Sequence, residues 1–168
     1  MKIAVLTGSF DPITLGHLDI ISRASKLVDK LYVVAFINEN KKYLFTSIQR
    51  LDMMKIATKN FSNVVCDFSS GYACDYCLKV GAKFMIRGIR NKVDYEYEKD
   101  LAKQNMDYKG IETLFLLANN DINSKDIREK ISKKECIDNV TKAVEEYILG
   151  VQNERDWKFD WRIRRYSF

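Results

Sequence analysis

The sequence has few of the residues that break helices and strands or that build metal and catalytic centres. Its 168 residues include one proline, one histidine and seven glycines. It has no apolar run near the roughly 18 residues that a membrane-spanning helix needs, so we expect no membrane partner. Of its four cysteines, Cys74 and Cys77 form a single C-x-x-C, and no second pair or histidine completes a zinc pattern. We therefore expect reduced, packed thiols.

The charge of the chain is modest, with a formal net value of +5 at pH 7 and with lysine and arginine spread along the sequence. Such a surface serves polyphosphate ligands and solubility as well as it serves nucleic acid, and we expect no nucleic-acid partner. An apolar strand pattern begins at Lys2, which leaves no room for a signal peptide before it. We therefore expect a cytoplasmic protein.

Short apolar runs alternate with amphipathic helical patterns along the chain. Strands are predicted over residues 2–7, 31–37, 63–68, 83–86 and 111–117, and helices over 15–28, 47–60, 71–80 and 93–105, followed by C-terminal helices. Five βα units predict an α/β fold, namely a Rossmann-like, doubly wound, mostly parallel five-stranded sheet with helices on both faces. The ligand crevice of such a sheet lies at the carboxyl ends of its strands.

Length and composition predict one domain over residues 1–150 and a C-terminal extension over 151–168. Between Trp157 and Arg164, apolar and polar residues alternate with a period of two, which is typical of a strand. The extension therefore has three alternatives: an extra strand, an aromatic arm laid on a neighbouring subunit, or a frayed basic tail. Its two tryptophans favour packing.

The histidine and the proline both lie in the stretch 8–17, directly after the apolar run 3–6. A strand that feeds a glycine-containing turn and a helix presents unpaired N–H groups and partial positive charge, which bind anions. Phosphate is the expected ligand, with His17 as a hydrogen-bond donor. A lone histidine near a helix start is also often a cap or a packing residue. The stretch fits neither the G-x-x-x-x-G-K-[ST] loop nor the G-x-G-x-x-G fingerprint.

Two motifs together resemble one family. Residues 8–17 read G-S-F-D-P-I-T-L-G-H, which resembles the histidine signature of nucleotidyltransferases. Residues 87–90 read R-G-I-R and residues 94–98 read D-Y-E-Y-E, which is similar to a signature of the bacterial phosphopantetheine adenylyltransferases. The resemblance implies transfer of the adenylyl group of ATP to 4′-phosphopantetheine, giving dephospho-coenzyme A and pyrophosphate in coenzyme A biosynthesis. It also implies Mg²⁺ as cofactor, a homohexamer, and coenzyme A as a feedback ligand.

The implied reaction needs no general base, because a phosphate monoester is already ionised near neutral pH. Catalysis then consists of holding two anionic substrates in line and stabilising charge on the α-phosphate and the leaving pyrophosphate. The absence of a Ser-His-Asp or Cys-His set is consistent with this chemistry. We expect no metal ligands from the protein, because no carboxylate cluster forms a cage, and substrate oxygens and water would hold the Mg²⁺.

The resemblance also implies individual roles. His17 would be catalytic, with a hydrogen bond to the α-phosphate. The residues implied in ATP binding are Ser9, Phe10, His17, Gly88, Ile89, Arg90, Glu98, Asn123, Ser124 and Lys125. Those implied in phosphopantetheine binding are Ser9, Lys41, Ala73, Arg87 and Asn105. We expect the loops after the first, second and fourth strands to bring these residues together, although Lys41 beside Lys42 is also typical of a solvated loop pair.

The segment after the fifth strand departs from the family pattern I-S-S-[ST]-x-[VIL]-[RK]. Residues 122–128 read I-N-S-K-D-I-R, so Asn123 and Lys125 replace hydroxyl residues, and the loop before them is shorter. These side chains still hydrogen-bond and contact phosphates. Two alternatives stay open: a related nucleotidyltransferase with another phosphorylated acceptor, such as a nicotinamide or glycerol phosphate, and a retired paralogue that binds coenzyme A or a nucleotide.

Overall fold

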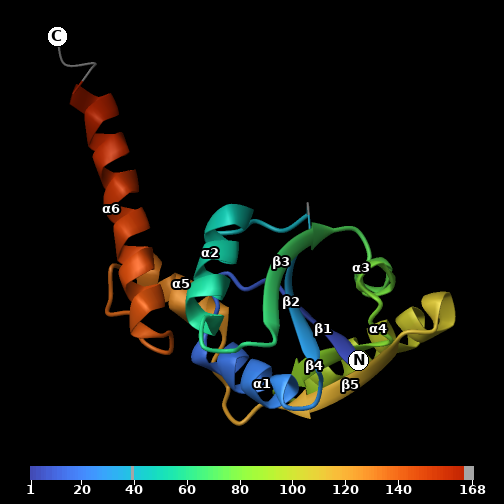
Figure 1. Cartoon of the computed structure of the whole chain (residues 1–168). Helices are drawn as coiled ribbons and strands as arrows, with labels where there is room; N and C mark the ends of the chain where they lie inside the picture. Colours follow the sequence, from blue (N-terminus) through green and yellow to red (C-terminus); the bar gives the residue numbers. More distant parts are fainter. Residues whose placement is uncertain (39, 165–168) are drawn as a thin grey trace.

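One five-stranded parallel sheet forms the centre of the computed structural model, which describes residues 1–38 and 40–164 (Figure 1). The strands are β1 (Ile3–Gly8), β2 (Lys30–Ile37), β3 (Val64–Ser70), β4 (Phe84–Ile89) and β5 (Glu112–Leu117). They pair in the order β3-β2-β1-β4-β5, and every pairing is parallel. The predicted α/β fold with a parallel sheet is therefore confirmed.

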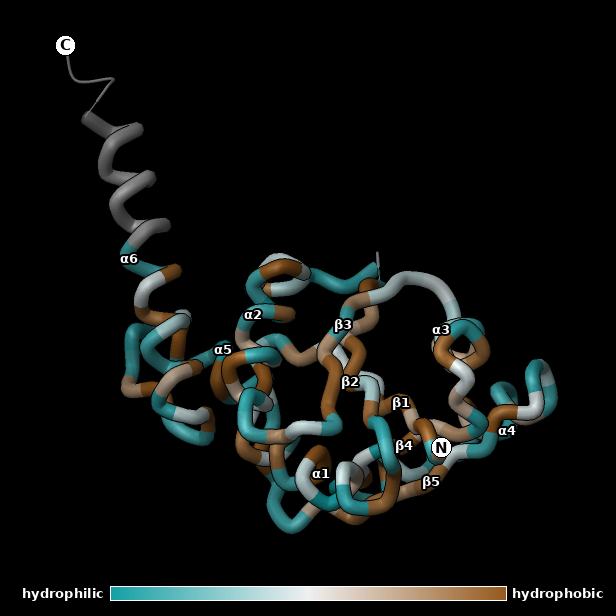
Figure 2. Tube along the Cα trace, in the orientation of Figure 1, coloured by the Kyte–Doolittle hydropathy of each residue, from teal (hydrophilic) through white to brown (hydrophobic). Residues whose placement is uncertain are grey.

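Helices cover both faces of the sheet. On one side lie α1 (Leu15–Ser25), α2 (Ser47–Thr58), α5 (Ser124–Ser132) and α6 (Lys142–Arg164), and on the other lie α3 (Ala73–Val80) and α4 (Lys92–Lys109) (Figure 1). Successive strand residues point to opposite faces, so Ala4 and Leu6 of β1 join the core beneath α1 while Val5 joins the core beneath α3. Figure 2 shows hydrophobic residues along the strands and mixed character along the helices. Within the described residues, no helix has both the length and the apolar character needed to cross a bilayer.

The strand order reverses between β1 and β4, where the chain first builds outward through β2 and β3 and later through β5. The connections on the two sides leave in opposite directions, which opens a crevice at the carboxyl ends of β1 and β4. In the register of this pair Leu6 lies opposite Ile86, so Thr7 lies close to Arg87. The fold thus places the first motif beside the second.

The ends of several elements differ from the prediction. Strand β4 continues through Arg87 and Gly88 to Ile89, so these residues belong to a strand and not to the loop after it. They stay in the strand because residues 87–89 pair with residues 115–117 of β5. Helix α1 ends at Ser25, before the predicted end at Val28, and the side chain of Val28 is nevertheless buried.

The strand predicted between Trp157 and Arg164 is wrong, because α6 continues as a helix to Arg164. The only proline of the chain is Pro12, so none interrupts this segment, and a helix that has already formed its first turns extends at little cost. The interface arm and the frayed tail stay predictions. Residues 165–168 lie outside the described residues.

The cysteines are all unpaired. Cys74 and Cys77 are buried, and Cys66 is half-buried. Burial raises the pKa of the Cys77 thiol to about 12 and also raises the pKa of Cys66. The prediction of packed thiols is wrong for Cys136, which is exposed.

Candidate functional site

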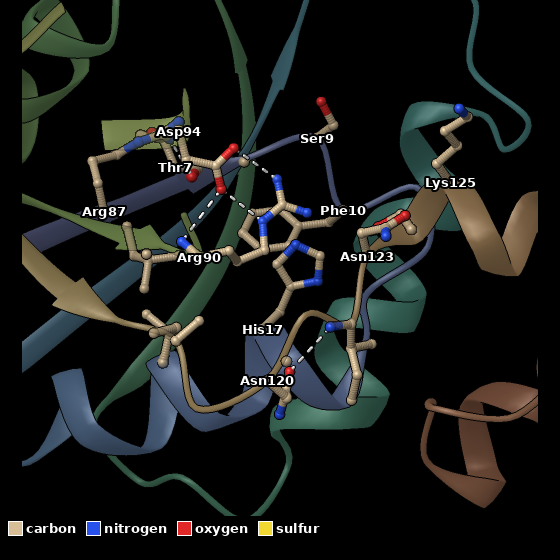
Figure 3. A pocket seen from close by; sticks show the side chains of 18 of the residues that line it. Thr7, Ser9, Phe10, His17, Arg87, Arg90, Asp94, Asn120, Asn123 and Lys125 are labelled. Carbon is tan, nitrogen blue, oxygen red and sulfur yellow. Dashed lines mark hydrogen bonds and ion pairs between the residues drawn. The ribbon is translucent and has the colours of Figure 1, made fainter. Parts of the chain in front are cut away.

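A pocket of about 600 Å³ opens at the carboxyl ends of β1 and β4 (Figure 3). It is formed by the turn between β1 and α1, the end of β4, the first turns of α4, and the loop that leads into α5. Its polar and charged lining residues are Thr7, Ser9, His17, Arg87, Arg90, Asp94, Glu98, Asn120, Asn123, Ser124, Lys125, Asp126 and Arg128. The pocket therefore carries cations, amides and hydroxyl groups, which suit a phosphate-rich ligand.

His17 and Thr14 cap each other at the start of α1. The amide of His17 donates to Thr14 Oγ1 at 3.2 Å, and the amide of Thr14 donates to His17 Nδ1 at 3.0 Å. Because Nδ1 accepts a backbone hydrogen bond, the neutral ring carries its proton on Nε2. Among the described residues Nε2 has no protein partner, so its N–H group is free to donate to a ligand in the pocket.

His17 stays neutral at physiological pH. Burial, together with the positive charges of Arg90 and Arg87, lowers the pKa of its imidazole to about 4. The ring of Phe10 packs edge-on against it, with 5.0 Å between the ring centroids. Phe10 reaches this place with a positive φ of 47°, and a Cβ on Gly8 would lie 2.9 Å from its ring. The close packing of Phe10 therefore requires glycine at position 8.

Side chains from distant elements hold the turn between β1 and α1 through three of its carbonyl oxygens. The three pairs are Arg50 Nη1 with Ser9 O at 2.7 Å, Arg128 Nη1 with Asp11 O at 2.8 Å, and Ser124 Oγ with Pro12 O at 2.8 Å. The carboxylate of Asp11 accepts from the amides of Leu44 and Phe45, each at 2.9 Å. The turn is therefore fixed before any ligand binds, as a preorganised phosphate site requires.

Arg87 is already engaged by protein groups. Its Nε donates to Glu98 Oε2 at 2.7 Å and its Nη2 donates to Glu98 Oε1, which makes a bidentate ion pair. Its Nη1 donates to the carbonyl oxygen of Thr7 at 2.5 Å and to Thr7 Oγ1. A guanidinium has five N–H donors, so these contacts leave Arg87 about one for a ligand. Arg87 therefore contributes a fixed positive charge to ligand binding and few free hydrogen-bond donors.

Arg90 also lines the pocket and is more exposed than Arg87. Its Nε donates to Asp94 Oδ2 at 2.8 Å and its Nη2 donates to Asp94 Oδ1 at 3.2 Å (Figure 3). About a third of its side chain is exposed (37%), so its remaining donors face solvent and the pocket. Asp94 belongs to the same acidic helix start that supplies Glu98, and the two carboxylates orient the two arginines.

Asn123 stands directly before α5 and caps that helix. Its side chain accepts from the amide of Asp126 at 3.0 Å, which makes it the N-cap of the helix. Asparagine and serine are about equally good in this position, so the departure from the family pattern leaves the helix start intact. Lys125 follows in the first turn and is largely exposed, with only a 3.8 Å approach to Glu129.

The loop before α5 lies directly on α1. A Cβ on Gly16 would lie 3.0 Å from Asn120 Oδ1 and 3.1 Å from the carbonyl oxygen of Ile122. Asn120 Oδ1 in turn accepts from the amide of Ile122 at 3.3 Å (Figure 3). Glycine at position 16 is therefore what lets this loop form a wall of the pocket.

The structure brings most of the predicted ligand residues into this pocket, namely Ser9, Phe10, His17, Arg87, Gly88, Arg90, Glu98, Asn123, Ser124 and Lys125. Four others do not line it. Ile89 is buried, Lys41 is exposed in the loop after β2, Ala73 begins α3, and Asn105 lies on α4. Their roles stay predictions.

Sequence reasoning assigned no role to several residues of the lining. Thr7 and Asp94 hold the two arginines, Asn120 lies against Gly16, and Arg128 holds the carbonyl oxygen of Asp11. Asp94 and Arg128 stand inside the quoted motifs, so the motifs contain a signal for them. Asn120 has no such signal, because its place depends on how the loop folds over α1.

The pocket offers no protein cage for a metal ion. Within the described part of the chain, no group of three or more His, Cys, Asp or Glu side chains is placed to hold one. The carboxylates of Asp94 and Glu98 are paired with arginines. A divalent cation in this pocket would depend on ligand oxygens and water.

Comparison with known proteins places the chain in a family. Residues 5–130 match the family model described as cytidylyltransferase-like. A phosphopantetheine adenylyltransferase of Leuconostoc citreum is 39% identical over 92% of this chain and 99% of its own length. The chain belongs to the phosphopantetheine adenylyltransferase family. Another family member, from Frankia alni, is 45% identical over 71% of this chain and 76% of its own length.

The fold of the present chain is also found in a solved structure of lower sequence similarity. The crystal structure of a putative nicotinate-nucleotide adenylyltransferase from Vibrio parahaemolyticus covers 89% of this chain and 99% of its own, with a TM-score of 0.68 and 20% identity. At this level of identity the likeness concerns the fold alone.

Proposed function

We propose that this protein transfers the adenylyl group of ATP to 4′-phosphopantetheine and forms dephospho-coenzyme A and pyrophosphate, a step of coenzyme A biosynthesis. Its relatives that share most of its length are named for this activity. The observation that carries the proposal is the neutral His17, whose free Nε2–H lies in one pocket with Arg87 and Arg90. Such a set stabilises phosphate charge and supplies no general base or nucleophile.

In this reaction a phosphate oxygen of 4′-phosphopantetheine attacks the α-phosphorus of ATP. The bond from the α-phosphorus to the bridging oxygen breaks, and pyrophosphate leaves with that electron pair. His17 Nε2–H would donate to an α-phosphate oxygen, where negative charge grows in the transition state. Arg90 and Lys125 would neutralise the β- and γ-phosphates, and the Ser9 turn would hold the triphosphate at the start of α1.

Nucleotide binding would further involve Phe10, Gly88, Ile89, Glu98, Asn123 and Ser124. Ile89 is buried and would act through its backbone. The acceptor would use Ser9, Lys41, Ala73, Arg87 and Asn105. The N-cap of α3 and α3 itself contact α4 through the rings of Tyr72 and Tyr108, 6.1 Å apart, and through Asp75 and Lys109 at 3.6 Å, so the two helices are neighbours. Ala73 and Asn105 lie on these two helices.

Mg²⁺ would accompany the triphosphate and withdraw charge from the phosphates during transfer. The residues present fit this arrangement. Of the three carboxylates of the pocket, Asp94 and Glu98 already hold arginines and Asp126 accepts from the Asn123 side chain at 2.8 Å, and a magnesium ion bound to a nucleotide keeps mostly phosphate and water ligands. Coenzyme A carries both the pantetheine arm and an adenosine diphosphate group. It would occupy the same subsites and act as a feedback ligand.

The proposal extends to assembly and location. Several large apolar side chains of the described residues are exposed, among them Leu114 and Leu117 on the edge strand β5, Tyr72 at the start of α3 and Tyr108 on α4. Apolar surface of this kind supports a homo-oligomer, and we propose a hexamer. The unpaired thiols support a reducing, cytoplasmic setting. Sedimentation of the full chain beside a chain ending at Asn153 would measure the assembly and the part that the C-terminal extension takes in it.

The test of the activity is pyrophosphate release from ATP and Mg²⁺ with each acceptor in turn. We expect release that depends on 4′-phosphopantetheine and that falls sharply in a His17→Ala variant. Pyrophosphate release with nicotinamide mononucleotide or glycerol 3-phosphate instead would overturn the assignment of 4′-phosphopantetheine as the acceptor. If no acceptor gives pyrophosphate release, although the protein still binds coenzyme A, the proposed activity would be overturned.

A further inference from the structure

Arg50 is a charged side chain buried without a counter-charge. It is 1% exposed and is the largest of the fully buried side chains in the described structure. Among the side chains that the structure describes, no carboxylate lies within ion-pair distance of its guanidinium. An arginine does not lose its proton in a protein, so this burial is costly and calls for a compensating role.

The contacts of Arg50 link α2 to the Ser9 turn and to Tyr43. It stands on α2 and does not line the cavity, yet its Nη1 donates to the carbonyl oxygen of Ser9 at 2.7 Å. Its guanidinium stacks on the ring of Tyr43, with Cζ 4.0 Å from the ring centroid. Its buried Nε has no hydrogen-bond partner among the described residues. A charge-assisted bond to Ser9 is thus its main polar attachment.

Tyr43 extends this attachment to the end of β2. Its hydroxyl donates to the carbonyl oxygen of Phe36 at 3.3 Å and accepts from the amide of Asn38 at 3.0 Å. These bonds close the segment that carries Lys41. Arg50 therefore joins two loops, one with Ser9 and one with Lys41, whose residues are assigned above to the two substrates.

We propose that Arg50 is a positioning residue for adenylyl transfer, which fixes the Ser9 peptide and aligns it with the loop of Lys41. The inference rests on the proposed function. The bond to Arg50 turns the Ser9 carbonyl oxygen toward α2, so that its partial negative charge does not repel the phosphates. The buried guanidinium also adds positive potential at the phosphate site. Arg50 acts through Ser9 and touches no reacting atom.

The chain provides a matched control in Arg23. This arginine of α1 also donates to a main-chain carbonyl oxygen, that of Leu117 at 2.6 Å, and its Nε is likewise buried and unpartnered among the described residues. It is paired with Asp19 at 2.7 Å and does not line the pocket. The variants to compare are Arg50→Met, Arg50→Lys and Arg23→Met, each with the folded fraction measured by thermal unfolding.

We expect Arg50→Met to lower kcat/KM per folded molecule about 100-fold, mostly in kcat, because a displaced turn misaligns the attack. Arg50→Lys keeps the charge and a donor, and we expect it to recover part of this loss. Arg23→Met should lower stability and leave kcat/KM per folded molecule unchanged. Equal effects of Arg50→Met and Arg23→Met per folded molecule, or no recovery in Arg50→Lys, would overturn the proposal.

A second readout needs no turnover. His17 is the only histidine of the chain, and its ring packs against Phe10, the neighbour of Ser9. We expect the Cε1–H signal of His17 in proton NMR to move in Arg50→Met and to stay in place in Arg23→Met. An unmoved signal in both would overturn the positioning role. Absence of turnover in the wild-type protein would contradict the proposed function alone, because the NMR comparison would still decide the role of Arg50.

Discussion

Thr14 and His17 exchange hydrogen bonds between side chain and main chain in both directions, so that the residue that caps α1 also sets the tautomer of the histidine. Glutamate or glutamine usually takes the second position of such a capping box. A histidine there ties one ring nitrogen to the backbone and leaves the other as a donor. The local rule for starting a helix thus also prepares a phosphate ligand.

His17→Ala should slow turnover with little loss of ATP affinity. The removed Nε2–H donor acts mainly on charge that develops in the transition state, so we expect a loss of about 2–4 kcal/mol in transition-state stabilisation. Steady-state kinetics and calorimetric ATP titration check this. His17→Gln is the control, because glutamine keeps the capping box and separates helix stability from chemistry. Equal losses in binding and turnover would contradict the assigned role.

The pH dependence of the single histidine follows from its environment. Its pKa is about 4 in the folded protein and 6.5 when unperturbed, so the unfolded chain binds more protons between these values. The stability of the fold should therefore rise with pH across this window, with roughly 1–3 kcal/mol attributable to His17. Proton NMR of His17 measures the pKa directly, and bound pyrophosphate should raise it. A pKa near 6.5 in the free protein would contradict the burial of the ring.

Glu98→Gln should release Arg87 from its bidentate pair. We expect a loss of about 2 kcal/mol in stability, because the guanidinium is left partly buried and unpaired. The KM for 4′-phosphopantetheine should rise several-fold. Glu96→Gln is the matched control on the same helix, since its pair with Lys99 is exposed and contributes little. Because Glu98 is also proposed to take part in nucleotide binding, the KM for ATP should rise as well. A rise in the KM for ATP alone would mean that Glu98 does not act on the acceptor through Arg87.

Asn123→Ala should remove the cap of α5 and cost about 1 kcal/mol, whereas Asn123→Ser should keep the stability of the wild-type protein. Thermal unfolding measures both. Because α5 also carries Ser124 and Lys125 into the pocket, the alanine variant should raise the KM for ATP as well. If serine and alanine behave alike, the cap has no part in shaping the pocket.

The substitution Gly16→Ala has two opposite effects on stability. Alanine favours a helix over glycine by about 1 kcal/mol, but here the added Cβ would press on Asn120 and the carbonyl oxygen of Ile122. We expect net destabilisation and a higher KM for ATP, because the loop before α5 must move. Gly150→Ala is the control, since that glycine has nothing within 4 Å and its substitution should stabilise α6. Similar stabilisation by both substitutions would show that the loop before α5 moves away from the added Cβ at no cost.

The order of strands and helices was predictable from the sequence because it depends on local periodicity. Runs of apolar residues and amphipathic repeats are set by neighbours a few positions apart, and the right-handed connections of a parallel sheet then leave few arrangements. The gathering of Ser9, His17, Arg87 and Arg90 followed from the same geometry, because the carboxyl ends of parallel strands share one edge. The motifs of residues 8–17 and 87–98 indicated the family.

Only the tertiary structure decided what depends on distant partners. Arg87 belongs to a strand because β5 pairs with it, and its donors are engaged because α4 returns Glu98 to the end of β4. Arg50 resembles a surface residue of a helix until the Ser9 turn and Tyr43 enclose it. The low pKa of His17 likewise comes from burial and from two arginines some 70 residues away. The sequence by itself determined the fold and the kinds of groups at the site, while desolvation and long-range pairing, which no local pattern records, determined how those groups are charged and held.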